Sequence, residues 1–315
     1  MDVFVIGATG FVGAGVASHL TAHDHRVTGL ARTPAAAERL SATGVVPWRG
    51  DLDEGRDEVI AAAARADAVI YAAQLDPPGE LAAVGALVEA LAGSGRTLVF
   101  TSGSGVFLQR TGGAWSPDSY AETDPFTVEP LATHRRAAEE MVLRAADRDV
   151  RAMVVRPGLI WGSGDHGHVS LIYQSVAATG AACYVGEGLN TYTNVHIDDV
   201  ARLYELALRR GSAGAVYHAA GGEVPNRWIA EAVARDLGCG TRSLTPAEAA
   251  TVWGEFGALI MGASSRSRDP RTRVELGWTP QKTDMLSLVG EPRLRRLARG
   301  TAAAPRGAYA PLRQT

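Results

Sequence analysis

Three glycines near the start of the chain have the spacing of a dinucleotide-binding loop. Gly7, Gly10 and Gly13 follow an apolar run and precede a stretch that is typical of a helix up to about His23. Glycines at these positions permit a tight turn, a close approach of the backbone to a pyrophosphate, and close packing of a helix on a strand. The phosphates then lie at the helix N-terminus, where unpaired N–H groups and the helix dipole favour anions. The predicted contacts are Gly7, Thr9, Gly10, Phe11, Val12 and Gly13.

The type of dinucleotide is indicated by Arg32, at the end of the second apolar run. An NAD-selective protein usually offers an acidic residue to the ribose hydroxyls at this point. A guanidinium group can instead pair with a 2′-phosphate, so we expect NADP (NADPH) as the cofactor, with NAD the less favoured alternative. Further cofactor contacts are expected where the third and fourth runs end, from Asp51, Leu52, Ala72, Ala73 and Gln74.

Histidines and cysteines give no pattern that predicts a metal site. His166 and His168 share a glycine-rich loop, but the sequence indicates no third ligand, so contact with a substrate is the preferred interpretation. Cys183 and Cys239 are far apart and have no CxxC partner, which argues against a disulfide framework.

The apolar runs that must position these residues alternate with alanine-rich helical stretches. Such runs without internal alternation are typical of parallel strands that helices cover on both sides. They lie at residues 2–7, 26–31, 44–48, 67–72, 96–101 and 150–155. The predicted fold is therefore an α/β Rossmann fold, a doubly wound parallel sheet with helices on both faces and a smaller C-terminal substrate lobe.

The predicted domain organisation has three parts. Residues 1–155 form the dinucleotide-binding domain, and residues 156–290 form mainly the substrate lobe, with some strands and helices that return to the sheet. Within this second part we expect helices near 198–209 and 226–237. Residues 291–315 carry six arginines without a hydrophobic period, which predicts a mobile or loosely packed tail.

Composition narrows the classes of partner. The 315 residues are 46% hydrophobic and 21% charged with a formal net charge of -3, which is ordinary for a globular protein and gives no basic face for nucleic acid. The sequence shows no basic leader and no apolar stretch of about 18 residues, so no membrane partner and a cytoplasmic location are expected. A small-molecule substrate is expected, and the protein is a monomer or a homodimer.

Taken together, these motifs resemble the extended and atypical branches of the short-chain dehydrogenase/reductase superfamily, the NAD-dependent epimerase/dehydratase-like proteins. The resemblance rests on the glycine loop, on Asp51-Leu52, and on residues 155–162, 194–201 and 275–280. It implies a cofactor domain interleaved with a substrate lobe, and an active site between them at the carboxyl ends of the strands. The further cofactor contacts expected on this basis are Thr101, Arg135, Pro157 and Gly158.

The catalytic residues of this superfamily are a Tyr-x-x-x-Lys pair and a serine. Alignment on Pro130 and the glutamates of the following helix puts Leu131 at the tyrosine and Arg135 at the lysine, and Gly103 takes the place of the serine. Leucine cannot transfer a proton, and arginine is always charged, although it can still hold the ribose hydroxyls. The candidate replacements are Ser102, Ser104, Tyr120, His134 and His166.

Three functions are compatible with these residues. The preferred one is an NADP-dependent oxidoreductase of a small, fairly apolar metabolite such as an imine or a conjugated alkene, because hydride transfer needs mainly positioning. The second is an epimerase, dehydratase or cyclase with a recycled or structural dinucleotide. The third is a noncatalytic NADP-binding sensor.

Overall fold

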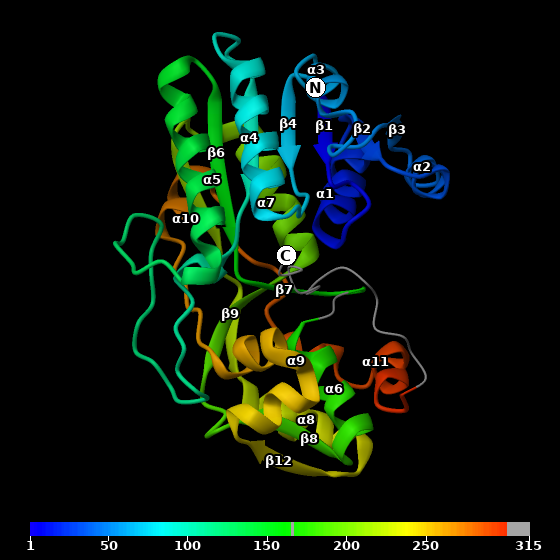
Figure 1. Ribbon diagram of the computed structural model, residues 1–315, viewed down its shortest axis with the longest axis vertical. Helices are drawn as coiled ribbons and strands as arrows, with labels where there is room; N and C mark the ends of the chain where they lie inside the picture. Colours follow the sequence, from blue (N-terminus) through cyan, green and yellow to red (C-terminus); the bar gives the residue numbers. More distant parts are fainter. Residues whose placement is uncertain (165–166, 301–315) are drawn as a thin grey trace.

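The protein consists of a larger lobe built on a parallel sheet and a smaller lobe below the carboxyl ends of its strands (Figure 1). The computed structural model describes residues 1–164 and 167–300. The sheet has seven strands in the order β10-β6-β5-β4-β1-β2-β3. Their bounds are β1 (Asp2–Ile6), β2 (Arg26–Ala31), β3 (Val46–Arg49), β4 (Ala68–Tyr71), β5 (Thr97–Thr101), β6 (Arg151–Pro157) and β10 (Ala215–Ala219).

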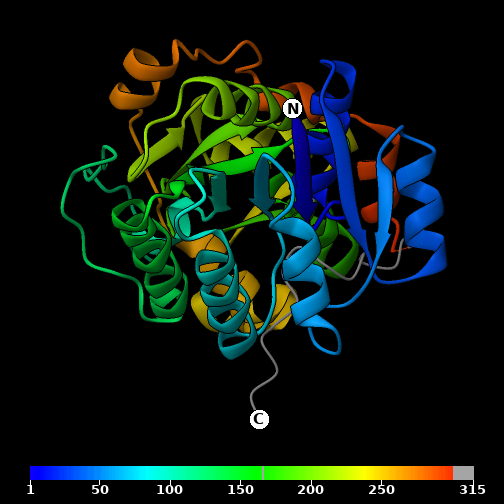
Figure 2. The ribbon, with the colours of Figure 1, turned by 90° about the horizontal axis from the view of Figure 1, so that it is seen from above.

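Helices cover both faces of this sheet, as Figure 2 shows from above. On one face lie α1 (Phe11–Ala22), α2 (Pro34–Ser41), α7 (Ile197–Arg210) and α10 (Pro270–Leu276), and on the other α3 (Arg56–Ala63), α4 (Pro77–Leu91) and α5 (Thr133–Arg144). Successive residues of a strand point to opposite faces, so Val5 packs under α1 and α7 whereas Phe4 packs under α3 and α4. This double cover explains why the strands are apolar without alternation.

The six predicted strands are confirmed to within two residues at each end, but the bounds of a seventh, which returns to the sheet from residues 156–290, were not predicted. β10 adds a parallel edge strand beside β6, with Tyr217 opposite Val155. Its five residues are all buried, so the apolar run was present in the sequence although it fell within the expected substrate lobe. The strand order reverses between β1 and β4, and a ligand crevice forms at such a reversal because the loops leave in opposite directions.

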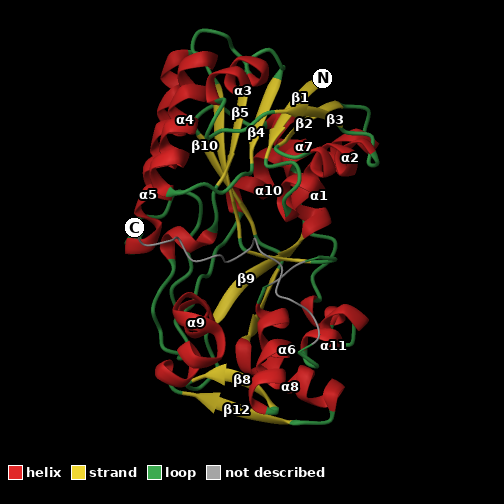
Figure 3. Ribbon diagram, turned by 45° about the vertical axis from the view of Figure 1, so that its right-hand side comes forward, coloured by secondary structure: helices red, strands yellow, loops and turns green. Residues whose placement is uncertain are grey.

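The smaller lobe has a core of its own (Figure 3). Its strands are β7 (Leu159–Trp161), β8 (Ala181–Val185), β9 (Thr191–His196), β11 (Gly222–Pro225) and β12 (Gly240–Leu244). Its helices are α6 (His168–Thr179), α8 (Asn226–Leu237), α9 (Pro246–Gly262) and α11 (Pro292–Leu297), and short 3-10 turns occupy Ser104–Phe107, Pro130–Ala132, Ala145–Arg148 and Met285–Leu288. The helices predicted near 198–209 and 226–237 are confirmed as α7 and α8.

The prediction of a loosely packed tail is wrong for residues 291–300. α11 buries Leu294 and Leu297 against the core of the smaller lobe, next to α6. The helix is only 6 residues long, which is too short for a hydrophobic period to be recognised. Residues 301–315 lie outside the described part of the chain. Within the described part, no helix is both long enough and apolar enough to cross a membrane.

Candidate functional site

The glycine loop has the backbone geometry that its spacing predicts. Gly7 has φ +90°, and a Cβ there would lie 2.6 Å from the carbonyl carbon and oxygen of Ala72. A Cβ on Gly13 would overlap the Gly7 carbonyl oxygen. The loop is therefore wedged between β1, β4 and α1, at the point where the strand order reverses. Only residues without a side chain fit this close approach.

The N-terminus of α1 offers a place for an anion. α1 begins after Gly10, and its first turn contains no acidic residue that would compete for the unpaired N–H groups. Thr9 and Gly10 are exposed, while Phe11 and Val12 are half-buried. A Cβ on Gly164 would lie 3.9 Å from the Phe11 ring, so the loop that follows β7 passes close to this helix end. Phosphate contact by these residues stays a prediction.

Two arginines stand together at the carboxyl ends of β2 and β3. Arg32 follows β2, and Arg49 ends β3, where it is paired with Ala31. Arg49 Nη2 donates to the Arg32 carbonyl oxygen at 3.3 Å. Both side chains are exposed, and within residues 1–164 and 167–300 neither has a carboxylate at ion-pair distance. Arg32 was predicted from the sequence but Arg49 was not, although Arg49 directly follows the apolar run at residues 44–48.

The other residues predicted to contact the adenosine half of the cofactor differ in their burial and in their contacts within the protein. The Asp51 carboxylate accepts a hydrogen bond from the Asp53 backbone N–H at 2.8 Å. Leu52 is only 3% exposed and packs in the core on the α3 and α4 side, so its side chain serves packing first. Ala72 and Ala73 are half-buried beside Gly7, and Gln74 is exposed. Small side chains at 72 and 73 leave the crevice open next to the glycine loop.

Arg135 is held in place by two oxygen atoms. Its Nη1 lies 2.8 Å from Glu80 Oε1 on α4 and donates to the Thr101 carbonyl oxygen, at the end of β5, at 3.1 Å. Its guanidinium carbon lies 5.5 Å from the centre of the Phe100 ring. Glu80 is fully buried, and burial raises the pKa of its carboxyl although the Arg135 charge acts against this shift. Arg135 is therefore a fixed cation next to a carboxyl group whose ionisation is opposed by burial.

His134 and Tyr71 lie near the pair formed by Arg135 and Glu80, and we call these four side chains the group around Arg135. His134 Nε2 lies 3.7 Å from Glu80 Oε2, and burial together with the Arg135 charge lowers the pKa of the ring. The Tyr71 hydroxyl is buried at the end of β4, where burial and the Glu80 charge raise its pKa. Both are therefore neutral near pH 7. The His134 ring faces α4, and Glu80 and Tyr71 were missed because nothing in their local sequence marks them.

Leu131 and the two serines beside Gly103 are the residues that the sequence alignment sets at or next to the superfamily's tyrosine and serine positions. Replacement of the catalytic residues stays a prediction. Leu131 lies in the 3-10 turn Pro130–Ala132 before α5 and is 50% exposed. The Ser102 hydroxyl faces the buried Glu139 on α5 and helps to lower the pKa of that carboxyl. Ser104 is buried, and its carbonyl oxygen accepts from the Ser265 hydroxyl at 2.7 Å.

Tyr120 is bound into a different part of the molecule. Its backbone pairs with Arg266 and Arg268, and its hydroxyl accepts a hydrogen bond from Gln109 Nε2 at 3.1 Å. Its ring packs on Phe107, with ring centres 5.2 Å apart. None of these contacts joins it to the group around Arg135, so the structure does not bring the two together. A proton-donating role for Tyr120 stays a prediction.

A buried ion pair sets the position of α5. Arg156 on β6 forms two hydrogen bonds to Glu139, of 2.7 and 2.5 Å, and both side chains are almost completely buried. Burial alone would raise the pKa of Glu139, but the hydrogen bonds and charge of Arg156 outweigh it and lower the pKa. Removal of one partner of such a pair is strongly destabilising. The pair was not predicted.

The smaller lobe contains a buried histidine with a polar partner. His168 begins α6, is buried, and contacts Asn226 Oδ1 through Nδ1 at 2.8 Å, so its Nε2 retains the lone pair. Burial lowers the pKa of this ring to about 4 although the bond to Asn226 acts against the shift. Tyr192 stands edge-on to it at 4.6 Å. His166 lies outside the described residues.

Pro157 and Gly158 connect the two lobes. Pro157 ends β6, and a Cβ on Gly158 would overlap the carbonyl oxygen of Thr193 in β9. Packing therefore already explains the glycine at 158, and cofactor contact there stays a prediction. His196 caps α7 by accepting from the Asp198 backbone N–H at 3.1 Å.

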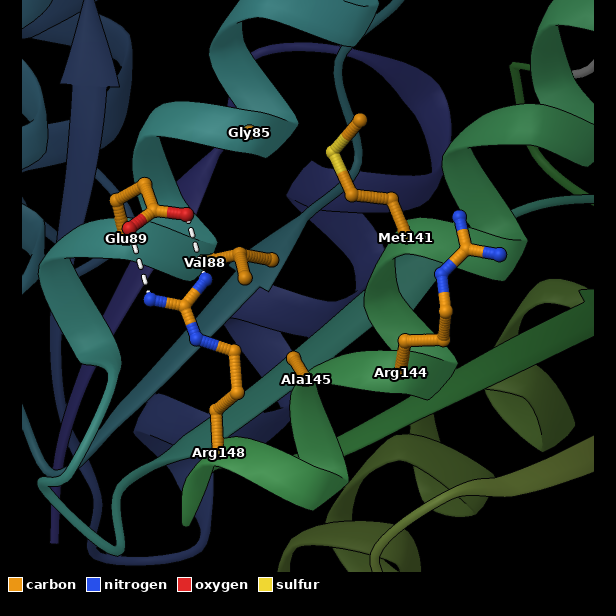
Figure 4. Close-up of a pocket in the computed structure, with 7 residues that line it drawn as sticks. All are labelled: Gly85, Val88, Glu89, Met141, Arg144, Ala145 and Arg148. Carbon is orange, nitrogen blue, oxygen red and sulfur yellow. Dashed lines mark hydrogen bonds and ion pairs between the residues drawn. The ribbon is translucent and has the colours of Figure 1, made fainter.

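A hollow of about 430 Å³ between α4 and α5 is not part of this group (Figure 4). It lies toward the C-terminal halves of both helices, whereas Glu80 stands in the first turn of α4. Arg148 spans its edge with two hydrogen bonds to Glu89, and Met141 faces Gly85 across it. A second hollow of about 460 Å³ lies beside Trp161, His196 and residues 281–284.

Comparison with known proteins agrees with this geometry. Residues 3–220 match the NAD dependent epimerase/dehydratase family. The chain belongs to this family. It is 30% identical over 302 residues to an uncharacterized protein of Saccharomyces cerevisiae, a match that covers 91% of this chain and 97% of that one. Members of this family are NAD(P)-dependent enzymes, and the extended short-chain dehydrogenase/reductase resemblance is thereby confirmed.

One further relative by sequence and one solved structure of similar fold are also informative. A 2-alkyl-3-oxoalkanoate reductase of Stenotrophomonas maltophilia is 30% identical over 228 residues, which covers 68% of this chain and 67% of that one. The crystal structure of dTDP-glucose 4,6-dehydratase from Bacillus anthracis in complex with NAD superposes with a TM-score of 0.73 at 17% identity and covers 94% of this chain and 96% of that one. This structural similarity to the dehydratase confirms the Rossmann-like fold.

Proposed function

We propose that the chain is an NADPH-dependent reductase of a small, fairly apolar metabolite, with an imine or a conjugated alkene as the preferred substrate class. The observation that carries the choice of cofactor is the pair Arg32 and Arg49, two exposed guanidinium groups at adjacent strand ends. A 2′-phosphate on the adenosine ribose suits such a pair, because arginine forms forked, charge-assisted hydrogen bonds to phosphate.

The described residues fit a bound dinucleotide. A side chain at Gly7 or Gly13 would collide with neighbouring backbone, and the first turn of α1 offers unpaired N–H groups to a pyrophosphate. The role proposed for Arg135 is to hold the nicotinamide ribose, and its contacts with Glu80 and the Thr101 carbonyl support this by fixing its orientation. When bound, the cofactor supplies the hydride.

Reduction is preferred over epimerisation for two reasons. The aligned Leu131 cannot transfer a proton, and an iminium substrate already carries one, so such a substrate needs mainly positioning. Two relatives with assigned activities are named as a ketoreductase, from Stigmatella aurantiaca, and as a 2-alkyl-3-oxoalkanoate reductase.

The test combines binding with turnover. Dissociation constants for NADPH and NADH are measured first, and then nicotinamide absorbance is followed with a panel of small cyclic imines, conjugated enones and β-keto esters. We expect tighter binding of NADPH and its consumption with at least one class. Conversion of a substrate without net change in absorbance would instead identify an epimerase, dehydratase or cyclase. Cofactor-dependent association with a protein, and no turnover, would identify a sensor.

A further inference from the structure

Three ionisable side chains lie close together where the C-terminal end of α1 meets α7. We call this place the α1–α7 corner; the glycine loop is at the other end of α1. His19 and His23 lie one turn apart at the C-terminal end of α1, and Glu205 projects from α7. One ring nitrogen of each histidine and one carboxylate oxygen all lie within 4.8 Å of one another. His19 Nε2 is 2.8 Å from Glu205 Oε2, and the two imidazole rings stack with centres 4.0 Å apart.

The hydrogen bonds around the corner fix which atoms carry lone pairs. His23 Nδ1 lies 2.8 Å from the His19 carbonyl oxygen, which can only accept. Nδ1 therefore bears the hydrogen, and in the neutral ring Nε2 keeps its lone pair. Arg209 Nη2 holds the other Glu205 oxygen, Oε1, at 2.9 Å and so orients the carboxylate. Outer hydrogen bonds of this kind are typical partners of histidine and carboxylate ligands of metals.

We propose that His19, His23 and Glu205 form a binding site for a divalent transition metal, with Zn²⁺ as the probe. Two histidines at i and i+4 on a helix with a carboxylate from elsewhere are a donor set that zinc accepts, and water then takes the fourth position. Ligand atoms of a tetrahedral zinc site lie about 3.4 Å apart, so a spacing within 4.8 Å needs only small side-chain movements.

The surroundings favour a cation at this corner. α1 ends at Ala22, and its dipole gives this helix end a partial negative charge. The ion pair with Arg209 holds Glu205 in place, with its Oε2 turned toward His19. His23 is exposed, which leaves a path for an ion.

An ordinary ion pair of His19 with Glu205 would not need His23. The stacked second imidazole, with its Nδ1 hydrogen on a carbonyl, is the observation that distinguishes a metal site from that pair. A bound ion would connect α1, which carries the glycine loop at its other end, to α7. The helices already pack closely, because a Cβ on Gly15 would lie 2.7 Å from Ile197. The role expected of the ion is to brace these two helices.

The test uses the full chain, freed of any histidine tag and of metal. Zn²⁺ is titrated by calorimetry, Co²⁺ is added to follow its visible absorption, and the melting temperature is recorded against Zn²⁺ concentration. We expect one Zn²⁺ per chain and a melting temperature that rises with the logarithm of the Zn²⁺ concentration. His23→Gln and Glu205→Gln should each weaken binding by at least about tenfold, since each removes one of three ligands.

Asp24→Asn is the matched control. Asp24 is the exposed acid next to His23 and has φ +62°, a conformation that asparagine also tolerates. This variant should bind Zn²⁺ as the wild type does. If wild type shows no binding, or if His23→Gln and Glu205→Gln bind as tightly as wild type, the proposal is wrong. Because His23 is exposed, its variant is expected to fold, and a normal melting curve without metal verifies this.

Discussion

Arg135 Nη1 lies 2.8 Å from the carboxylate of the fully buried Glu80, which places a cation of α5 against the first turn of α4. The same nitrogen donates to the carbonyl oxygen of Thr101. A single charged side chain thus joins two helices to the carboxyl end of β5. Arg135, which the sequence alignment sets at the lysine position of the superfamily, is thus a cation whose orientation is fixed by its surroundings.

The first prediction concerns Glu80→Gln. Glutamine removes the carboxylate that lies 2.8 Å from Arg135 and so weakens one of its two anchors. We therefore expect affinity for NADPH and for NADH to fall by a similar factor, about three- to thirtyfold, as for the loss of one contact with a charged group. Binding is measured by calorimetry. Glu140→Gln, which changes a more exposed acid on α5, is the control and should bind both cofactors normally. Unchanged affinity in Glu80→Gln would contradict the positioning role.

The second prediction concerns Arg32→Ala. If Arg32 contacts the 2′-phosphate, affinity for NADPH should fall by about 10- to 100-fold, which corresponds to about 1.5–3 kcal/mol for a charged hydrogen bond. Affinity for NADH should hardly change, because NADH lacks that phosphate. Arg39→Ala, an exposed arginine of α2, is the control. An equal loss for both cofactors would reverse the assignment of NADP.

The third prediction separates backbone strain from collision at a glycine. Gly7 and Gly93 both have positive φ, but a Cβ would collide with Ala72 at the first and meets nothing within 4 Å at the second. Gly93→Ala should lower the free energy of unfolding by about 1 kcal/mol, the cost of the left-handed backbone. Gly7→Ala should lower it by about 3 kcal/mol or more and weaken dinucleotide binding. Urea unfolding gives the comparison, and equal losses would disprove the close approach.

The fourth prediction concerns the pH dependence of stability. Burial lowers the pKa of His168 to about 4 from 6.5, so between these values the unfolded chain binds a proton that the folded chain does not. The free energy of unfolding should therefore fall as the pH drops through this window, by about 1.4 kcal/mol per pH unit for one such group.

His168→Gln should make this fall less steep by about that amount, because glutamine does not titrate and can still hydrogen-bond Asn226. Burial also lowers the pKa of His218 to about 4, so part of the slope should persist in the variant. Urea unfolding at several pH values between about 4 and 6.5 measures both slopes. Identical slopes in the two proteins would show that His168 is not buried in its neutral form.

The sequence by itself determined the features that depend on local backbone physics. Turn sterics at Gly7 and Gly13 and apolar runs of strand length act within a few residues, so the glycine loop, six strands of the sheet and the family were predictable. Arg32 was found because its position follows directly from the end of β2. The short helix α11 and the edge strand β10 were not recognised, because each is brief and lies outside the regular alternation.

Only the tertiary structure decided which distant side chains meet. Glu80 and Arg135 are 55 positions apart, and 186 positions separate His19 from Glu205. Arg49 reaches Arg32 because β2 and β3 are neighbours in the sheet. These contacts depend on strand order and helix packing, which bring together residues that no local pattern connects. Most of the strands could therefore be predicted from the pattern of apolar residues along the chain. The contact of Glu80 with Arg135 could be recognised only in the assembled fold.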